Sequence, residues 1–443
     1  MKGWFSVSVI DLSKYRNAVN TTKPVNYLGY VTQIVGLTIE SKGPQVSMGE
    51  ICVIKGEERD IKAEVVGFKD SKVLLMPLGE MVGIGPGQPI FSTGEVLQVK
   101  VGDQLLGRAL DGLGRPIDGK PPVDSDKFYP VQNDAPQPLS RNRIKDYLQM
   151  GVKVIDGLLT IGKGQRVGIF AGSGVGKSTL LGMIARNTKA DINVIALIGE
   201  RGREVKEFLE KDLKEEGLKR SVVITATSDQ PALVRVKAAL LATSVAEYFR
   251  DQGRDVMLMM DSLTRFSMAQ REIGLATGEP PVSRGYTPSV FSMMPKLLER
   301  AGNSDKGSIT GLYTVLVDGD DLTEPITDTA RGILDGHIVL SRKIANKNHY
   351  PAIDVLASIS RVMGDITTSE HRQYAGHIKS LMATYREAED LINIGAYSKG
   401  SNKDIDMAVK KIDMINNFLR QKVDENISFD DTANMMKEIA EFS

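Results

Sequence analysis

The feature that most constrains the fold is a glycine-rich turn between an apolar run and an apolar helix pattern. The run RVGIFA (166–171) is typical of a buried strand, GSGVG (172–176) of a tight loop, and KSTLLGMIAR (177–186) of a helix. Glycines let backbone N–H groups approach an anion closely, and the helix start adds the positive end of its dipole. Because a lysine and two hydroxyl residues follow, the stretch predicts a loop that binds a nucleoside polyphosphate.

The pattern G-x4-G-K-[S/T] assigns a role to each residue of this loop, although Ala171 occupies the place of its first glycine. Alanine is compatible with that place if the residue keeps an ordinary strand backbone. We expect Lys177 to contact the β- and γ-phosphates and Ser178 to bind Mg²⁺. The residues expected to enclose the polyphosphate are Gly172, Ser173, Gly174, Val175, Gly176, Lys177, Ser178 and Thr179.

Two further apolar runs end in acidic residues. The run DVMLMMD delivers Asp261 at the end of a predicted strand, where a ligand to a Mg²⁺-bound water belongs. Taken alone, such an Asp is also explained as the cap of the helix that follows. The run NVIALIGER ends in Glu200 and Arg201, and an acid at this edge of a sheet can orient an attacking water. By itself, the second pattern is better explained as a charged run that opens a helix.

The rest of the chain has three compositional zones around an α/β region. From about 150 to 370, short apolar strands alternate with amphipathic helices, which predicts a parallel sheet covered on both faces. Residues 1–95 hold short β-rich runs, typical of a small barrel or sandwich. Residues 107–138 are rich in Gly, Pro and Asp, which predicts a linker rather than a packed element. Residues 375–443 have helical spacing.

Composition narrows the class of protein. Lys and Arg total 56 and Asp and Glu total 56, so the net charge is zero and no nucleic-acid partner is expected. Cys52 is the single cysteine and lies in an apolar run, which predicts a buried thiol in the reducing cytoplasm. There is no signal-peptide pattern and no apolar run of about 18 residues. We therefore expect a cytoplasmic protein that reaches a membrane only through a partner.

Several ordered stretches resemble the catalytic subunits of the rotary ATPase superfamily. The chain is most similar to flagellar and type III secretion export ATPases in RGYTPSVFSMMPKLLERAG, DGLGRPIDG and LINIGAYSKGS, and the resemblance spans about residues 25–420. It implies a RecA-like P-loop NTPase core with an N-terminal β-barrel and a C-terminal helical domain. The implied activity is Mg-dependent ATP hydrolysis that powers protein export. The stretches that carry the wider resemblance are GERGREV, AGSGVGKST, DSLTRFSMAQREI, PPVSRGYTPSVFSMMPKLLERAG, DGDDLTEPITDTARGILDGHIVLSR and YPAIDVLASISRVM.

The resemblance also implies roles for single residues. Glu200 matches the carboxylate that activates water, and Asp261 the Walker B acid that holds Mg²⁺ with Ser178. Arg361 matches the arginine finger that reaches the γ-phosphate of the neighbouring subunit, and an intrachain ion pair is its alternative. Tyr350 matches the aromatic residue that packs on adenine, with a plain core tyrosine as its alternative. Arg201, which follows Glu200, is counted with the catalytic residues and is expected to orient this loop. Tyr397 is a further candidate for packing near adenine.

The implied assembly is a homohexameric ring, because one chain carries both the water-activating acid and the finger. The family pattern adds a stator-like regulatory protein at the N-terminus, a central stalk, export chaperones and substrates, and an indirect link to the membrane export gate. An imperfect apolar stripe at Ile10, Leu12, Tyr15 and Val19 favours partner binding there, against a frayed terminus. The expected division is a partner-binding segment 1–24, a β-barrel 25–95, a linker 96–149, an ATPase domain 150–372 and a helical domain 373–443.

Three other functions are compatible with the same core. One is the catalytic subunit of a proton-translocating ATP synthase, and a second is a ring-shaped RNA translocase, which the zero net charge disfavours. The third is a nucleotide-binding regulator without catalysis, which Glu200 disfavours. The choice between a flagellum and an injectisome stays open at this point.

Overall fold

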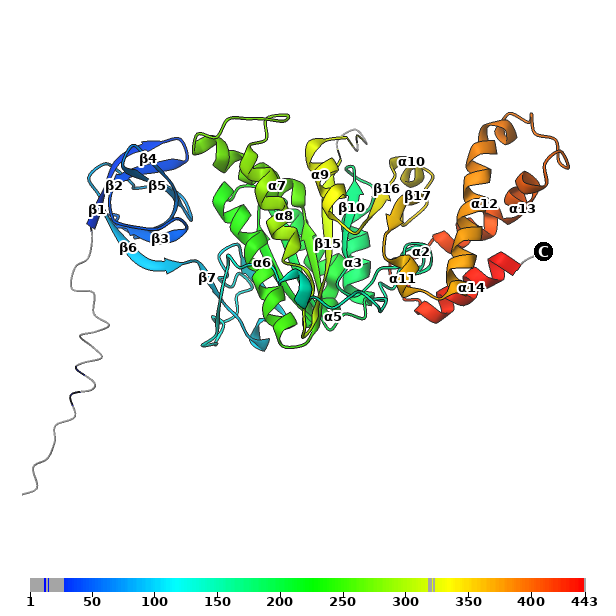
Figure 1. Cartoon of the computed structure of the whole chain (residues 1–443), viewed down its shortest axis with the longest axis horizontal. Coiled ribbons are helices and arrows are strands. Elements are labelled where there is room, and N and C mark those ends of the chain that lie inside the picture. Colours follow the sequence, from blue (N-terminus) through cyan, green and yellow to red (C-terminus); the bar gives the residue numbers. More distant parts are fainter. Residues whose placement is uncertain (1–11, 13–14, 16–27, 318–320, 322, 442–443) are drawn as a thin grey trace, which may run out of the picture. The chain divides into compact units, whose positions relative to one another are not determined.

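The computed structural model describes Leu12, Tyr15 and residues 28–317, 321 and 323–441 (Figure 1). Contacts group the chain into two units, Met1–Val96 and Leu97–Ser443. Apart from its Leu12 and Tyr15, the predicted partner-binding segment lies outside the described residues. The finer domain boundaries stay predictions.

The first unit is a closed antiparallel barrel, as predicted, with the strand order β1-β2-β5-β4-β3-β6. Its interior holds apolar side chains from alternate strand positions, such as Val31, Ile39 and Leu75. Cys52 is fully buried among them, as expected, and burial followed by the nearby Glu50 raises the pKa of its thiol to about 12. The strands are β1 (Leu28–Val35), β2 (Thr38–Lys42), β3 (Glu50–Ile54), β4 (Ile61–Lys69), β5 (Lys72–Pro77) and β6 (Pro89–Val96).

The second unit is built around a sheet with the order β17-β16-β10-β15-β13-β11-β12-β8. The strands from β16 to β8 in this order pair in parallel, as predicted, whereas β17 pairs antiparallel with β16. Strands β11 and β13 are apolar and buried almost throughout, because both faces of the sheet are covered. The short β14 (Gly302–Asn303) pairs with β15, and β7 (Gln98–Lys100) pairs with β9 (Phe128–Pro130). The main strands are β8 (Arg108–Asp111), β10 (Arg166–Ala171), β11 (Ile192–Ile198), β12 (Ser221–Ala226), β13 (Asp255–Asp261), β15 (Ser308–Leu316), β16 (Gly336–Leu340) and β17 (Ile353–Ser360).

Helices cover this sheet and continue into the predicted C-terminal helical region. The long α6 packs across β11, β12 and β13, and α14 and α12 both contact α2. The helices are α2 (Lys153–Leu158), α3 (Lys177–Asn187), α4 (Gly202–Glu207), α5 (Lys214–Lys219), α6 (Ala232–Asp251), α7 (Leu263–Ala276), α8 (Pro288–Glu299), α9 (Pro325–Ile333), α10 (Arg342–Asn346), α11 (Met363–Ile366), α12 (Ser369–Asn393), α13 (Lys403–Leu419) and α14 (Phe429–Glu441), with 3-10 turns η1 (Asp103–Leu105) and η2 (Pro138–Ser140) and a π-helical turn η3 (Phe208–Leu213).

One expectation is wrong: the segment 107–138 is not free of packed elements. Its β8 (Arg108–Asp111) pairs in parallel with β12 and forms one edge of the main sheet. Leu110 is fully buried there, and Arg108 is held by an ion pair with Asp118 at 2.6 Å. A four-residue strand between glycine-rich turns is too short to show a periodic pattern, so composition alone predicted a linker.

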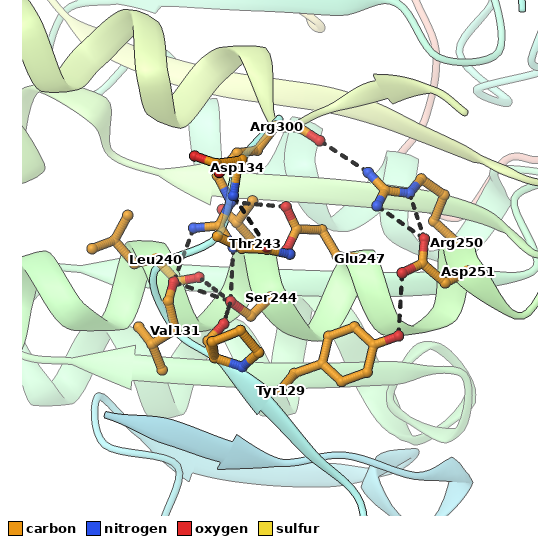
Figure 2. Close-up of polar contacts among 12 residues, drawn as sticks. Tyr129, Val131, Asp134, Leu240, Thr243, Ser244, Glu247, Arg250, Asp251 and Arg300 are labelled. Carbon is orange, nitrogen blue, oxygen red and sulfur yellow. Dashed lines mark hydrogen bonds and ion pairs between the residues drawn. The ribbon is translucent and has the colours of Figure 1, made fainter. Parts of the chain in front are cut away.

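A buried ionic cluster holds another part of the predicted linker on α6 (Figure 2). Arg300, at the end of α8, donates two hydrogen bonds of 2.8 Å to the carboxylate of Glu247 and a third of 3.0 Å to the carbonyl of Val131. Ser244 also accepts from Arg300 and donates to the backbone at 130–131. The side chains of Arg300 and Glu247 are 3% and 0% exposed, so each charge depends on the other for solvation.

Replacing Glu247 by Gln is therefore expected to lower the free energy of unfolding by about 3–5 kcal/mol, because it leaves the Arg300 charge buried without its counter-ion. A urea titration measures this change. Glu215→Gln, which breaks an exposed pair with Lys219, is the matched control and should change stability by less than about 1 kcal/mol. A loss no greater than that of the control would show that the buried pair contributes little.

Candidate functional site

The glycine-rich loop leads from the carboxyl end of β10 into α3, as the sequence predicts. Gly174 and Gly176 have φ values of 77° and 88°, a left-handed region that suits glycine. No side chain caps the start of α3 at Gly176, so the first backbone N–H groups of the helix are available to an anion. The loop is thus shaped and polarised to hold phosphates.

Lys177 bridges the two acids that the sequence singled out. Its ammonium contacts the carboxylate of Asp261 directly and lies 3.5 Å from the carboxylate of Glu200. Burial disfavours the charged lysine, but the two carboxylates outweigh burial and raise the pKa of Lys177. A loop lysine and the carboxyl ends of two neighbouring strands, β11 and β13, therefore meet at one point.

Asp261 does not cap the helix that follows it. Ser262 is the N-cap of α7, because its hydroxyl accepts the N–H of Arg265 at 3.2 Å. Asp261 is 4% exposed and instead accepts a 2.6 Å hydrogen bond from the hydroxyl of Thr314 on β15. With the capping role excluded, the position of Asp261 beside Lys177 supports the Walker B assignment, which stays a proposal.

Glu200 is partly buried, and its carboxyl group has a raised pKa. Burial, followed by the charge of Asp261, raises the pKa of Glu200 to about 7. Glu204, one helical turn further on, shares a hydrogen bond with Glu200, and this contact lowers the pKa of Glu204. A carboxyl group that titrates near neutrality is suited to accept a proton from water at physiological pH.

The acids and Ser178 surround a small cavity that has room for a single water or ion. It has a volume of about 20 Å³ and is lined by Ser178, Glu200, Glu204 and Asp261 together with apolar residues. Within the described ranges, no three His, Cys, Asp or Glu residues gather into a metal-binding cluster. This arrangement fits Mg²⁺, which takes one or two protein oxygens and completes its shell with phosphates and water.

Two residues at this site were missed by the sequence analysis, although both lie within motifs that it quoted. Glu204, in the first turn of α4, shares a hydrogen bond with Glu200 and lines the same cavity. Arg265 packs against Gly199, where an added Cβ would lie 2.9 Å from the Cβ of Arg265. The Nε atom of Arg265 is buried without a hydrogen-bond partner. Their spacing from Glu200 and Asp261 was the signal that could have identified them.

Tyr350 lies beside the phosphate loop, and Tyr397 is held by contacts within its own loop. Two ring carbons of Tyr350 lie 3.5 Å from the place where a Cβ of Gly176 would be, and the side chain is 42% exposed. Tyr350 is therefore not a plain core tyrosine. The hydroxyl of Tyr397 bonds locally, to the carbonyl of Asn402 and the carboxylate of Asp406, each at 2.9 Å. The loop after α12 thus holds Tyr397, and its place near adenine stays a prediction.

Arg201 and Arg361 are both exposed, in different surroundings. Arg201 lies at the N-cap of α4 and pairs with Glu204 at 3.4 Å, which is consistent with a role in orienting this loop. Arg361 follows β17 and donates to the carbonyl of Arg331 at 3.2 Å. Among the residues that the structure describes, Arg361 forms no ion pair within its own chain.

The strand register separates Tyr350 from Arg361. Strand β17 is antiparallel to β16, with Leu340 opposite Ile353 and Gly336 opposite Ser360. The start of β17 therefore lies at the carboxyl ends of the parallel strands, where the phosphate loop is, and its end lies at their amino ends. We call these two sides of the sheet the phosphate-loop edge and the opposite edge. About five residues of β10 separate the two edges, or roughly 17 Å at the usual rise. Tyr350 can serve the phosphate loop of its own chain, and Arg361 cannot.

This phosphate loop, with acids from two parallel strands, defines a nucleotide-binding ATPase core of the ATP synthase type. Family models agree: "ATP synthase alpha/beta family, nucleotide-binding domain" matches residues 151–360, and the beta-barrel domain of the same family matches 31–94. The model "T3SS EscN ATPase C-terminal domain" matches residues 367–438.

Individual relatives narrow this class. The chain is 56% identical to the flagellum-specific ATP synthase of Bacillus subtilis, over 92% of this chain and 94% of the relative. It is 51% identical to the type 3 secretion system ATPase of Xanthomonas euvesicatoria, over 93% and 94%. The assembled ATPase EscN of the enteropathogenic E. coli type III secretion system has a similar structure, with a TM-score of 0.88, 47% identity, and 93% of this chain and 100% of that chain covered. The chain belongs to the family of flagellar and type III secretion ATPases.

EscN has also been solved in complex with its central stalk EscO, and this structure matches with a TM-score of 0.87 and 47% identity over 93% of this chain. The family resemblance stated from the sequence is thereby confirmed, together with the fold class and the ATPase activity. In the described part of the chain, no helix has the length and apolar character needed to cross a bilayer.

The raised pKa of Glu200 predicts that kcat/KM for ATP decreases on the acid side of its pH profile, a part of the profile that we call the acid limb. The ionised form is the one that accepts a proton, so kcat/KM for ATP should fall about tenfold per unit as the pH drops below 7. In Glu204→Gln the limb should move to lower pH, because a negative neighbour of Glu200 is gone. Steady-state rates between pH 5.5 and 8.5 measure both profiles. Glu207→Gln, on the same helix α4, is the control and should leave the midpoint in place.

Proposed function

We propose that this chain hydrolyses ATP with Mg²⁺ as a homohexameric ring and so powers the export of flagellar or type III secretion proteins. The observation that carries the ring is the separation of the site into two half-sites at opposite edges of one sheet. The phosphate loop, Lys177, Glu200 and Asp261 lie at one edge, and Arg361 lies at the other. A neighbouring copy is needed to bring the two together.

At the loop edge, the residues of this chain bind and orient the substrates. The backbone N–H groups from Gly172 to Thr179 would hold the phosphates, and Lys177 would leave its carboxylate partners to contact the β- and γ-oxygens. Ser178 and Asp261 would hold Mg²⁺, which supplies charge neutralisation on the phosphates when it is bound. Tyr350 would pack on the adenine beside Gly176.

Glu200 would then orient the attacking water and accept its proton. Its carboxyl lies 3.5 Å from the ammonium of Lys177, so the base is held close to the position of the γ-phosphate. Arg361 of the adjacent copy would stabilise the charge that develops on the transferred group. Arg201, through its pair with Glu204, would keep the loop that carries Glu200 in place.

One partner is proposed from a solved relative, and the others rest on the family resemblance rather than on the geometry. Because EscN has been solved with a central stalk, we propose that a stalk protein engages the C-terminal helical region of the ring. We also propose a stator-like regulator at the N-terminal segment, chaperones and export substrates, and an indirect contact with the membrane export gate. The chain would act in the cytoplasm at that apparatus, without nucleic acid. The flagellar and secretion names of the relatives leave little support for a proton-driven synthase or an RNA translocase.

The shared site makes activity depend on assembly. The ATPase rate per chain should rise with protein concentration, and the rise should coincide with the appearance of hexamers in mass photometry. A complete site within one chain would instead give a constant rate per chain across the range in which the protein is monomeric. That result would overturn the shared-site proposal while leaving the ATPase assignment in place.

A further inference from the structure

A second arginine lies beside Arg361, and no carboxylate of the described residues pairs with either of them. Arg331 is in the last turn of α9, and its carbonyl accepts the hydrogen bond from the Arg361 guanidinium. The Nε atom of Arg331 is buried and has no hydrogen-bond partner. Burying a donor in this way is costly unless another group meets it in the working state.

The acid that follows α9, Asp335, is already engaged. Asp335 accepts two side-chain hydrogen bonds from Arg166, at 3.0 and 3.1 Å, and a third from the Arg166 backbone. Arg361 reaches Asp335 only through its backbone N–H, which donates to the Asp335 carbonyl at 3.0 Å. The carboxylate of Asp335 therefore pairs with Arg166 and with neither Arg331 nor Arg361.

A nearby histidine lies within reach of both arginine charges. His337, on β16, lies close enough that its pKa is lowered, first by burial and then by the charges of Arg331 and Arg361. Its ring nitrogen lies 3.1 Å from the carbonyl of Ala357, so the histidine is held in place by its own strand pair. The lowered pKa and the contact between Arg331 and Arg361 place two cationic groups together without a paired carboxylate among the described residues, and an anion would neutralise them.

The geometry of α9 also fixes the direction of Arg361. The last carbonyls of a helix have no partner within the helix and carry partial negative charge. The Arg331 carbonyl is one of them, and it holds the Arg361 guanidinium at 3.2 Å. The main chain of Arg331 thus orients Arg361, and its side chain adds a second guanidinium to the same edge.

We propose that Arg331 and Arg361 form a two-guanidinium site for the polyphosphate of a nucleotide held by the neighbouring copy. This inference rests on the proposed function, because it needs two copies to share a site. It adds a residue that the sequence patterns did not single out. Each planar guanidinium group can bind one pair of phosphate oxygens by two parallel hydrogen bonds. Two such groups can therefore bind two pairs of oxygens at once, and a single arginine finger can bind one pair.

The test is Arg331→Gln, which removes the charge and keeps much of the side-chain length. We expect kcat to fall by roughly 10–100-fold with little change in the KM for ATP, because the lost interaction is made mainly in the transition state. Arg331→Lys should recover only part of the rate, because it restores the charge without the planar fork. Trapping of ADP with aluminium fluoride, a transition-state mimic, should weaken in parallel. Arg59→Gln, an exposed arginine of the barrel, is the control and should behave as wild type.

Mixed rings separate this role from a structural one. Arg331→Gln chains mixed with Glu200→Gln chains should regain activity, because a Glu200→Gln chain donates intact arginines to the intact loop of an Arg331→Gln chain. If Arg331→Gln is fully active while Arg361→Ala is inactive, this inference about Arg331 is wrong and the proposed shared site stands. If Arg361→Ala chains regain activity when mixed with Glu200→Gln chains and Arg331→Gln chains do not, Arg331 only supports the fold. Full activity of Arg361→Ala would instead refute the proposed shared site.

Discussion

Arg361→Ala is expected to reduce kcat for ATP hydrolysis by roughly 10³–10⁵, the usual contribution of an arginine finger. The reason is that Arg361 lies at the sheet edge opposite the phosphate loop and has no ion pair among the described residues of its own chain. Nucleotide binding should persist, because the loop and Lys177 are untouched. Phosphate release in steady state, together with binding of a fluorescent ATP analogue, measures the two effects separately.

Mixing experiments locate the effect between chains. Rings assembled from Arg361→Ala and Glu200→Gln chains contain some interfaces in which a wild-type loop faces a wild-type finger, so activity should peak at intermediate ratios. Arg115→Ala, which removes an exposed arginine paired with Asp111, is the control and should stay active alone. Absence of recovery at every ratio would mean that Arg361 acts within its own chain or only in folding.

The sequence predicted the parts of the fold that repeat a local pattern. The strand, loop and helix around Lys177 could be predicted because an apolar run, a glycine-rich turn, the lysine and an apolar helix face follow one another without interruption. Strand β8 was missed because four residues carry no period, and its pairing with β12 is a long-range contact. Local propensity could not show that a glycine-rich segment is held by a sheet edge and by Arg300.

The candidate site was predictable by residue type and less so by position. Glu200 and Asp261 stood at the ends of predicted strands, and parallel strands end at a common edge. The contact of both acids with Lys177 depends on β11 and β13 being neighbours, an order that the sequence does not state. The separation of Tyr350 from Arg361 depends on the antiparallel register of β17. The role of Arg331 as an acceptor is a backbone property, which no side-chain motif encodes.

Glu200→Gln is expected to keep nucleotide binding and to lower kcat by about 10²–10⁴, the range for loss of a general base. The amide has the same shape but cannot accept a proton from water. Binding should be retained or tightened, because Lys177 then has Asp261 as its remaining anionic partner and is freer to meet the phosphates. Isothermal titration with ATP and single-turnover phosphate release give the two quantities.

The residual activity of Glu200→Gln provides the sharper test. If Glu200 is the group that titrates near pH 7, the acid limb of kcat/KM should disappear with it, and the remaining slow rate should be nearly flat from pH 6 to 8. Glu207→Gln should keep both the rate and the limb. A slow variant that retains the limb would assign the titration to another group, and Glu204, which shares the hydrogen bond with Glu200, would be the next residue to replace. Full turnover by Glu200→Gln would remove this carboxylate from the mechanism, and the ring would then need a different base at the same edge.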